Sequence, residues 1–214
     1  MKKTEIIDLS HTIEESMALF PGSSKPVITE ISNHNTNGYL EHYISYNSHT
    51  GTHVDAPAHI LEKGKPLTQY SIADFIGKGS CIDVSGLDVI DGNFIVKCKH
   101  ILAQTEFALF YTGKSKSWGT EDYYKDFPVF TEYAAQLLGT FNLKGVAMDS
   151  ISPDPIDSKD YIAHKTLLKY RILIIENLTA LDQLTGKNFT FHAIPLKTNI
   201  ADGSPIRAFA KLSL

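Results

Sequence analysis

The sequence predicts one α/β domain over residues 1–214, with a mixed, partly barrel-like sheet and a few helices on its outer side. A helical pattern followed by an apolar strand occurs twice in the second half of the chain, at 129–149 and at 159–176. That order is typical of α/β units. Short apolar runs bounded by turn residues indicate buried strands. A length of 214 residues with 43% hydrophobic residues is sufficient for one substantial core.

The first half of the chain consists mainly of predicted strands. Residues 6–10 and 27–31 form two of them. A polar stretch at 33–38 predicts a loop or the tip of a hairpin. The strand that follows, at 40–48, is rich in Tyr and Ile and leads directly into a histidine-rich segment.

Helices appear among the strands in the second half. Ser71 is expected to cap one short helical turn at 71–76, and 95–103 is ambiguous between helix and strand. The remaining predicted strands lie at 79–84, 105–113, 144–149 and 171–176, and the predicted helices lie at 129–141 and 159–170.

Composition and charge exclude several classes of function. The formal net charge of -4 provides no basic surface for nucleic acid. No apolar run approaches the roughly 20 residues that span a bilayer, and the first residues lack the apolar centre of a signal peptide. Cys81 and Cys98 lie in no CxxC pattern, so we expect reduced structural thiols in a cytoplasmic protein.

The stretch 48–59 concentrates three histidines and one carboxylate in a short segment. In an extended strand, side chains two positions apart share a face, so His49, His53 and Asp55 are expected to point the same way. Gly51 lies between them and has no side chain, which leaves room for an ion or a substrate. A helix could bring the two histidines together but would place Asp55 off their face.

Pro57 is also unfavourable in a helix, where it would cost about 3 kcal/mol. We expect it to end the strand and to turn the chain before His59. Two neutral imidazoles and a carboxylate suit a borderline divalent ion such as zinc or manganese. The segment therefore predicts a metal site, and the alternative is a group of unrelated surface histidines beside a proline loop.

Other residues are weaker candidates for the site. Glu176 ends a β-branched strand, and ligands gather at strand ends in α/β sheets. His164 lies in a helical pattern, where a histidine is more often exposed than a ligand. His11 follows the first strand, and we expect a structural role for it.

Two aromatic side chains could form the wall of a substrate pocket. Phe20 lies in an apolar segment that ends in Pro21-Gly22, which is a turn signal; the alternative is that Phe20 packs in the core. Trp118 lies in a polar stretch at 114–126 and could border a pocket or a partner protein.

The run HTGTHVDAPAH at 49–59 resembles the HxGTHxDxPxH signature of the cyclase-family metal-dependent hydrolases, which include bacterial kynurenine formamidase (arylformamidase) and isatin hydrolase. The stretch 148–155 resembles that family's D-x-x-S-x-D-P loop, and 202–208 resembles its D-x-SPxRA motif. His164 and Glu176 match the family's helix histidine and the glutamate twelve residues after it. The resemblance covers nearly the whole chain.

The resemblance implies a swivelling β/β/α fold and a set of metal ligands. His49, His53 and Asp55 would hold the first ion. Asp55 and Glu176 would bridge to a second ion, which His164 also binds. The implied cofactor is a divalent metal, as two Zn²⁺ ions or with Mn²⁺ in their place.

Two cations bridged by oxygen ligands would lower the pKa of a bound water far below its value in bulk solvent, towards about 7. The resulting hydroxide would attack a carbonyl carbon. We assign His59 as the general acid/base that carries a proton to the leaving nitrogen, because its ordinary pKa of about 6.5 suits that role. The alternative is that His59 is a further metal ligand.

The resemblance implies hydrolysis of an amide, formamide or lactam bond beside an aromatic ring. The first candidate substrate is N-formyl-L-kynurenine, which would yield L-kynurenine and formate. In kynurenine formamidases the pocket segment usually reads Trp-Pro-Gly-Asp, and its Trp packs on the substrate. Here it reads Phe20-Pro21-Gly22-Ser23, which keeps an aromatic ring and loses the indole and the acid.

Two other functions stay open. One is a hydrolase or cyclase that acts on another small cyclic amide, such as an isatin-like lactam. The other is a non-catalytic metal-binding protein, although a structural site is usually closed and contains cysteines. The resemblance further implies a homodimer or homotetramer in which an aromatic side chain from one subunit borders the pocket of the other. The remaining expected partner is a small-molecule amide, with neither nucleic acid nor membrane.

Overall fold

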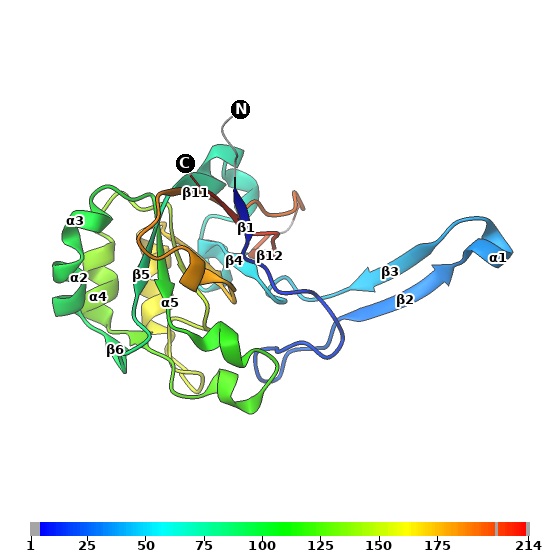
Figure 1. The fold of residues 1–214 in the computed structure, drawn as a ribbon, viewed down its shortest axis with the longest axis horizontal. Helices are drawn as coiled ribbons and strands as arrows, with labels where there is room; N and C mark the ends of the chain where they lie inside the picture. The colour runs from blue at the N-terminus through cyan, green and yellow to red at the C-terminus, as the bar shows by residue number, and fades with distance from the viewer. Residues whose placement is uncertain (1–4, 200, 213–214) are drawn as a thin grey trace.

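The computed structural model describes residues 5–199 and 201–212. Within this part of the chain, nine strands form one curled sheet in the order β1-β13-β11-β5-β7-β9-β10-β4-β12 (Figure 1). Strands β5, β7, β9 and β10 run parallel, and the strands on either side of them pair in antiparallel fashion. The predicted α/β class with a mixed, partly barrel-like sheet is therefore confirmed.

The elements have the following bounds. The strands of the large sheet are β1 Ile6–Asp8, β4 His53–Asp55, β5 Ile76–Asp83, β7 Phe107–Tyr111, β9 Gly145–Met148, β10 Leu173–Glu176, β11 Phe189–His192, β12 Gly203–Pro205 and β13 Phe209–Leu212. Two small pairs are β2 Val27–Ser32 with β3 Glu41–Ser45, and β6 Val89–Ile90 with β8 Val129–Phe130.

The α-helices are α1 His34–Asn37, α2 Gly92–Lys97, α3 Lys99–Leu102, α4 Glu132–Leu138 and α5 Ile162–Lys169. Short 3-10 turns occur at η1 Pro57–His59, η2 Leu67–Gln69, η3 Ile72–Phe75, η4 Lys114–Ser117, η5 Glu121–Tyr124 and η6 Leu181–Gln183. None of the helices in the described residues is long and apolar enough to cross a bilayer.

Strands β7 and β9 are apolar and buried at every position because both faces of the sheet are covered there. On β7, Phe107 and Leu109 face one hydrophobic cluster, whereas Ala108 and Phe110 face a second cluster built with α2, α4 and α5. Full burial of a Phe or Leu side chain contributes about 1.5–3 kcal/mol. Coverage on both sides explains why 107–111 reads as a continuous apolar run rather than an alternating one.

The strands β2 and β3 and the helix α1 form an arm that projects away from the body of the molecule, on the side opposite to α2, α3 and α4 (Figure 1). Asn33 caps α1 by accepting hydrogen bonds from the backbone N–H groups of Asn35 and Thr36. Large hydrophobic side chains on the arm and at its base are exposed: Val27, Ile28, Ile31, Tyr39, Leu40, Tyr43, Ile44 and Tyr46. The polar stretch predicted as a loop or hairpin tip is thus a hairpin tip.

Two predicted elements have different boundaries in the structure. The helix expected at 129–141 begins only at Glu132, because Thr131 caps it by accepting from the N–H of Ala134 at 3.1 Å. Residues 129–130 instead form β8, which pairs in parallel with β6. The ambiguous stretch 95–103 is helical and contains the end of α2 and all of α3.

Candidate active site

The pairing of β4 brings the histidine segment next to the distant glutamate. Strand β4 lies between β10 and β12, and Glu176 pairs directly with His53 in the antiparallel register. Paired residues on adjacent strands project from the same face of a sheet. Asp55 lies two positions after His53, so its side chain shares that face as well. Three candidate ligands are therefore placed together by backbone pairing alone.

The extended strand expected over 48–55 is wrong in its first half. Regular strand begins at His53, and Gly51 adopts a left-handed backbone conformation with φ of 65°. A Cβ on Gly51 would lie 2.8 Å from Cε of Met17, so the absent side chain makes room for Met17 rather than only for an ion or substrate. The turn still returns His49 to the cluster, where its Nδ1 lies 2.6 Å from Oδ1 of Asp55.

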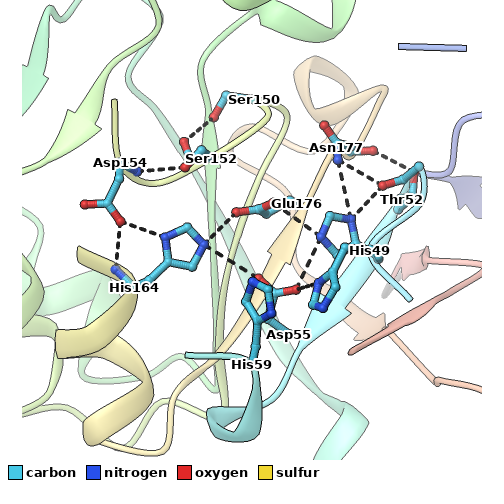
Figure 2. A network of polar contacts seen from close by, with 12 residues as sticks. His49, Thr52, Asp55, His59, Ser150, Ser152, Asp154, His164, Glu176 and Asn177 are labelled. Atoms are coloured by element: carbon cyan, nitrogen blue, oxygen red, sulfur yellow. Dashed lines mark hydrogen bonds and ion pairs between the residues drawn. The ribbon is translucent and has the colours of Figure 1, made fainter. Parts of the chain in front are cut away.

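A carboxylate holds His164 in the first turn of α5. Asp154 accepts from the backbone N–H of Ala163 at 2.8 Å and of His164 at 3.0 Å. Its Oδ2 also lies 2.7 Å from Nδ1 of His164. A carboxylate on one ring nitrogen fixes the tautomer and direction of a metal-binding histidine. Figure 2 shows His164 held between Asp154 on one side and Glu176 on the other.

Four of the predicted ligands form a buried cluster. Nε2 of His53 lies 3.3 Å from Oδ1 of Asp55 and 3.3 Å from Oε2 of Glu176. Nε2 of His164 lies 3.2 Å from Oε1 of Glu176 and 3.8 Å from Oδ2 of Asp55. None of these four residues is more than 6% exposed. The sequence reasoning from residues alone favoured an exposed His164, and that expectation is wrong.

The cluster fits a divalent cation. Oδ2 of Asp55 and Oε1 of Glu176 are buried, and no residue among those described donates a hydrogen bond to either oxygen. A buried carboxylate oxygen without a partner is costly. Imidazole nitrogens and carboxylate oxygens that converge in this way suit zinc or manganese. A cation bound between these side chains would contact Oδ2 of Asp55 and Oε1 of Glu176.

The electrostatics of the cluster favour positive charge. Burial lowers the pKa of His53, but the carboxylates of Asp55 and Glu176 outweigh it and hold that pKa well above its usual value. Burial opposes charge on Asp55, yet His49 and His53 hold its pKa well below the usual range. For His164, Asp154 and Glu176 outweigh burial and raise the pKa to about 10. Bound protons or metal cations can balance the negative charge of these carboxylates.

His49 and His59 lie at the more exposed edge of the cluster. Their ring centroids are 3.8 Å apart, and both histidines, with Asp55, could contact one cation. Asp202 lies 2.9 Å from Nε2 of His49 and 3.9 Å from Nδ1 of His59. Burial, assisted by the charges on His49 and His164, lowers the pKa of His59. His59 is therefore neutral at pH 7 and able to accept a proton.

Three residues near the cluster were not predicted as part of the site. Asp154 and Asp202 lie within motifs found in the sequence, but nothing in those motifs indicates which histidine each contacts. Asn177 follows Glu176 directly and donates to the carbonyl of Gly51 at 2.9 Å. Its position after a predicted ligand at a strand end was the only signal available.

The cluster opens into a cavity of about 330 Å³. Phe20 lines it, so the loop with the Pro21-Gly22 turn does form part of its wall. The other lining residues include Ala18, Leu19, Ser23, Asn47, Ile60, Ile151, Ser152 and Tyr161. Apart from the histidines and Glu176, no lining side chain among the described residues is charged.

Trp118 does not contribute to this wall in the described structure. Its ring stacks on His11, with centroids 3.8 Å apart and an interplanar angle of 5°. The backbone N–H of His11 donates to Oγ1 of Thr52 at 2.9 Å, so the pair packs behind the histidine segment. This placement agrees with the structural role expected for His11.

Comparisons with known proteins agree with this geometry. Residues 7–155 match the model of the putative cyclase family. Kynurenine formamidase of Bacillus thuringiensis subsp. konkukian (strain 97-27) is 31% identical over 214 residues, which cover 99% of this chain and 99% of that protein.

Solved structures are similar over the same length. Isatin hydrolase A from Labrenzia aggregata, bound to benzyl benzoate, has a TM-score of 0.87 and 25% identity, covering 99% of this chain and 94% of that one. A potential metal-dependent hydrolase with cyclase activity has a TM-score of 0.81 and 27% identity, covering 99% of this chain and 100% of that one. The family model and the full-length relatives agree with the histidine signature and with the pairing of β4 with β10. The chain belongs to the putative cyclase family.

Proposed function

We propose that this chain is a metal-dependent hydrolase that cleaves an amide bond next to an aromatic ring, in the manner of an arylformamidase. The observation that carries the proposal is the buried cluster of histidines and carboxylates at the cavity, with two buried carboxylate oxygens that accept no hydrogen bond from the described residues. The similarity to proteins named kynurenine formamidase and isatin hydrolase supports it.

In this proposal His49, His53, Asp55, His164 and Glu176 are the metal ligands. The donor set fits two Zn²⁺ ions, with Mn²⁺ as the alternative. When bound, such ions lower the pKa of water to about 7 and polarise a carbonyl oxygen. The carboxylates of the cluster favour positive charge at this position, and burial keeps competing water away from it.

His59 is the proposed general acid/base. It lines the cavity at the edge of the cluster, and its lowered pKa leaves the ring neutral at pH 7. It would take a proton from the attacking water and deliver it to the leaving nitrogen, which makes the amine a better leaving group. Phe20 would pack against the aromatic ring of the substrate from the cavity wall.

N-formyl-L-kynurenine is the first substrate to test, since its formamide is attached to an aromatic ring. A second candidate is an uncharged cyclic amide such as an isatin-like lactam. The uncharged cavity wall favours this second candidate, because no lining residue in the described structure other than the metal cluster would pair with the ammonium or carboxylate group of an amino acid. Desolvating an unpaired charge costs several kcal/mol.

The test is hydrolysis of N-formyl-L-kynurenine and of isatin by protein loaded with zinc or manganese, with chelated protein as the control. The proposal expects metal-dependent turnover of at least one of the two at an ordinary rate of about 1–10³ s⁻¹. Absence of turnover on both, in protein shown to contain metal, would contradict these two substrates, move the assignment to another amide or lactam, and leave the metal site intact.

We also propose that a second copy of the chain covers the arm, as a homodimer or as part of a homotetramer. An isolated two-stranded ribbon is only marginally stable in water, and this one exposes apolar side chains on both faces, such as Tyr43 on one and Ile44 on the other. Ser23 and Asn47, which flank the base of the arm, line the cavity. An aromatic side chain of a second copy docked along the arm could thus reach the rim of the cavity.

A further inference from the structure

The carbonyl oxygen of Gly51 is a shared acceptor behind the metal cluster. It lies 2.7 Å from Nδ1 of His53 and 2.9 Å from Nδ2 of Asn177. A carbonyl oxygen only accepts hydrogen bonds, so each of these two nitrogens must carry a hydrogen. His53 is therefore protonated on Nδ1, and its Nε2 is the atom directed at Asp55 and Glu176.

Tyr123 fixes the orientation of the Asn177 amide. Because Nδ2 of Asn177 faces Gly51, Oδ1 of the same amide faces the hydroxyl of Tyr123 at 2.6 Å. The amide oxygen accepts, so the hydroxyl donates. Burial raises the pKa of Tyr123 well above its usual value, which keeps the proton on the hydroxyl.

The reversed amide would disturb His53. Nδ2 of Asn177 also lies 3.4 Å from Nδ1 of His53. After a flip, Oδ1 would oppose the carbonyl oxygen of Gly51 and would compete with it for the hydrogen on Nδ1 of His53. The carbonyl of Gly51, which only accepts hydrogen bonds, makes this flip unfavourable, and the hydrogen bond from the Tyr123 hydroxyl to Oδ1 holds the amide in place.

We propose that Tyr123 is a positioning residue for the metal site: its hydroxyl holds the amide of Asn177, and that amide holds the Gly51 carbonyl that fixes the tautomer and direction of His53. This role rests on the proposed metal site. Groups that hold the second nitrogen of a metal-binding histidine typically change metal affinity 10–100-fold when they are removed. Tyr123 lies in η5, far along the chain from 49–59, so nothing in the sequence connects the two.

The neighbouring tyrosine provides a matched control. Tyr124 lies in the same short turn, and the rings of the two tyrosines are 5.6 Å apart in an edge-to-face arrangement. The hydroxyl of Tyr124 accepts from the backbone N–H of Leu19 at 3.1 Å. It therefore holds a residue of the cavity wall and has no hydrogen bond to Asn177. Replacing either tyrosine with Phe removes one hydroxyl and keeps the ring packing.

The experiment compares Zn²⁺ dissociation constants of the wild type, Tyr123→Phe and Tyr124→Phe by competition with a chromogenic chelator, together with melting temperatures of the metal-free proteins. We expect Tyr123→Phe to weaken zinc binding by about 10-fold, the low end of the range for groups that hold a ligand directly, because it acts through Asn177, and we expect Tyr124→Phe to leave zinc binding unchanged. Equal dissociation constants for Tyr123→Phe and the wild type, whatever the melting temperatures, would overturn the positioning role.

A second variant tests the same connection if Tyr123→Phe fails to fold. Asn177 has φ of 57°, a left-handed conformation that glycine adopts without strain, so Asn177→Gly removes the amide and retains the backbone. It should weaken zinc binding to a similar extent, and unchanged binding would overturn the proposal. A wild-type protein that binds no zinc would overturn the metal site and this role together, a result distinct from equal affinities.

Discussion

At the scale of single residues, His59 is the position where catalysis and metal binding can be separated. It lies at the exposed edge of the cluster, 3.8 Å from the ring of His49 between centroids, whereas the buried ligands surround Asp55 and Glu176. His59→Ala should therefore lower kcat by about 10²–10⁴-fold, as loss of a general acid/base does, while metal content and melting temperature stay close to those of the wild type.

Steady-state kinetics, elemental analysis and thermal melting together check this prediction. Loss of one metal equivalent in His59→Ala would instead make His59 a ligand. A lower melting temperature in His59→Ala, together with a wild-type protein that shows no turnover, would favour a site that only braces the fold.

Gly51 gives a second prediction at the same scale. A side chain there meets both a left-handed backbone, which costs about 1–2 kcal/mol, and the methyl carbon of Met17 at 2.8 Å. Gly22 also has a positive φ, of 89°, but nothing lies within 4 Å of its missing Cβ. Gly51→Ala should therefore reduce the free energy of unfolding more than Gly22→Ala does, as measured by denaturant titration, and an equal loss would show that Met17 moves aside freely.

The sequence predicted which side chains meet better than it predicted their local geometry. His49, His53 and Asp55 do meet, but a turn at Gly51 brings them together instead of a straight strand. The roles of Asp154 and Asp202 could not be derived from spacing. Asp202 contacts His49 across 153 residues, and Asp154 reaches His164 only because an irregular loop folds back onto α5. Side-chain direction at such contacts depends on tertiary packing rather than on local pattern.

At the scale of elements, the arm gives a prediction about assembly. Ile44 is 53% exposed and pairs across the ribbon with Ile28, which is also exposed. If a second copy covers the arm, a charge at this pair must be buried without a partner, which costs several kcal/mol. Ile44→Lys should therefore shift the protein from dimer or tetramer towards monomer.

Light scattering after size-exclusion chromatography measures this shift. Asn35→Lys, at the tip of the arm, adds the same charge without removing apolar surface and should leave the assembly unchanged. A wild-type protein that is monomeric at micromolar concentration would contradict the proposed partner.

Elements with strong patterns were predicted well, and their boundaries less well. The buried run at 107–111 and the cap at Ser71 were readable because burial on both faces and capping leave local signals. The local sequence did not predict that Val129–Phe130 forms a strand separate from α4. The cause is a pairing with Val89–Ile90, forty residues earlier, which no local window contains.

At the scale of the whole molecule, bound metal should contribute to stability because its ligands come from β4, α5, β10 and the turn before β4. A cation at 1,000 times its dissociation constant adds about 4 kcal/mol. For a chain of this size, that corresponds to a rise in melting temperature of roughly 8–16 °C. Chelation should reverse the rise and re-addition of zinc should restore it, as measured by calorimetry; an unchanged melting temperature would contradict binding to the native fold.

The order in which the strands are synthesised affects when the proposed metal site can form. Glu176 pairs with His53, yet it is synthesised about 120 residues later. At 5–20 residues per second, that interval is roughly 6–25 s. During this time the histidine segment has emerged without its partner strand. At the proposed site, metal would therefore be held by the full set of side chains only after Glu176 has been made.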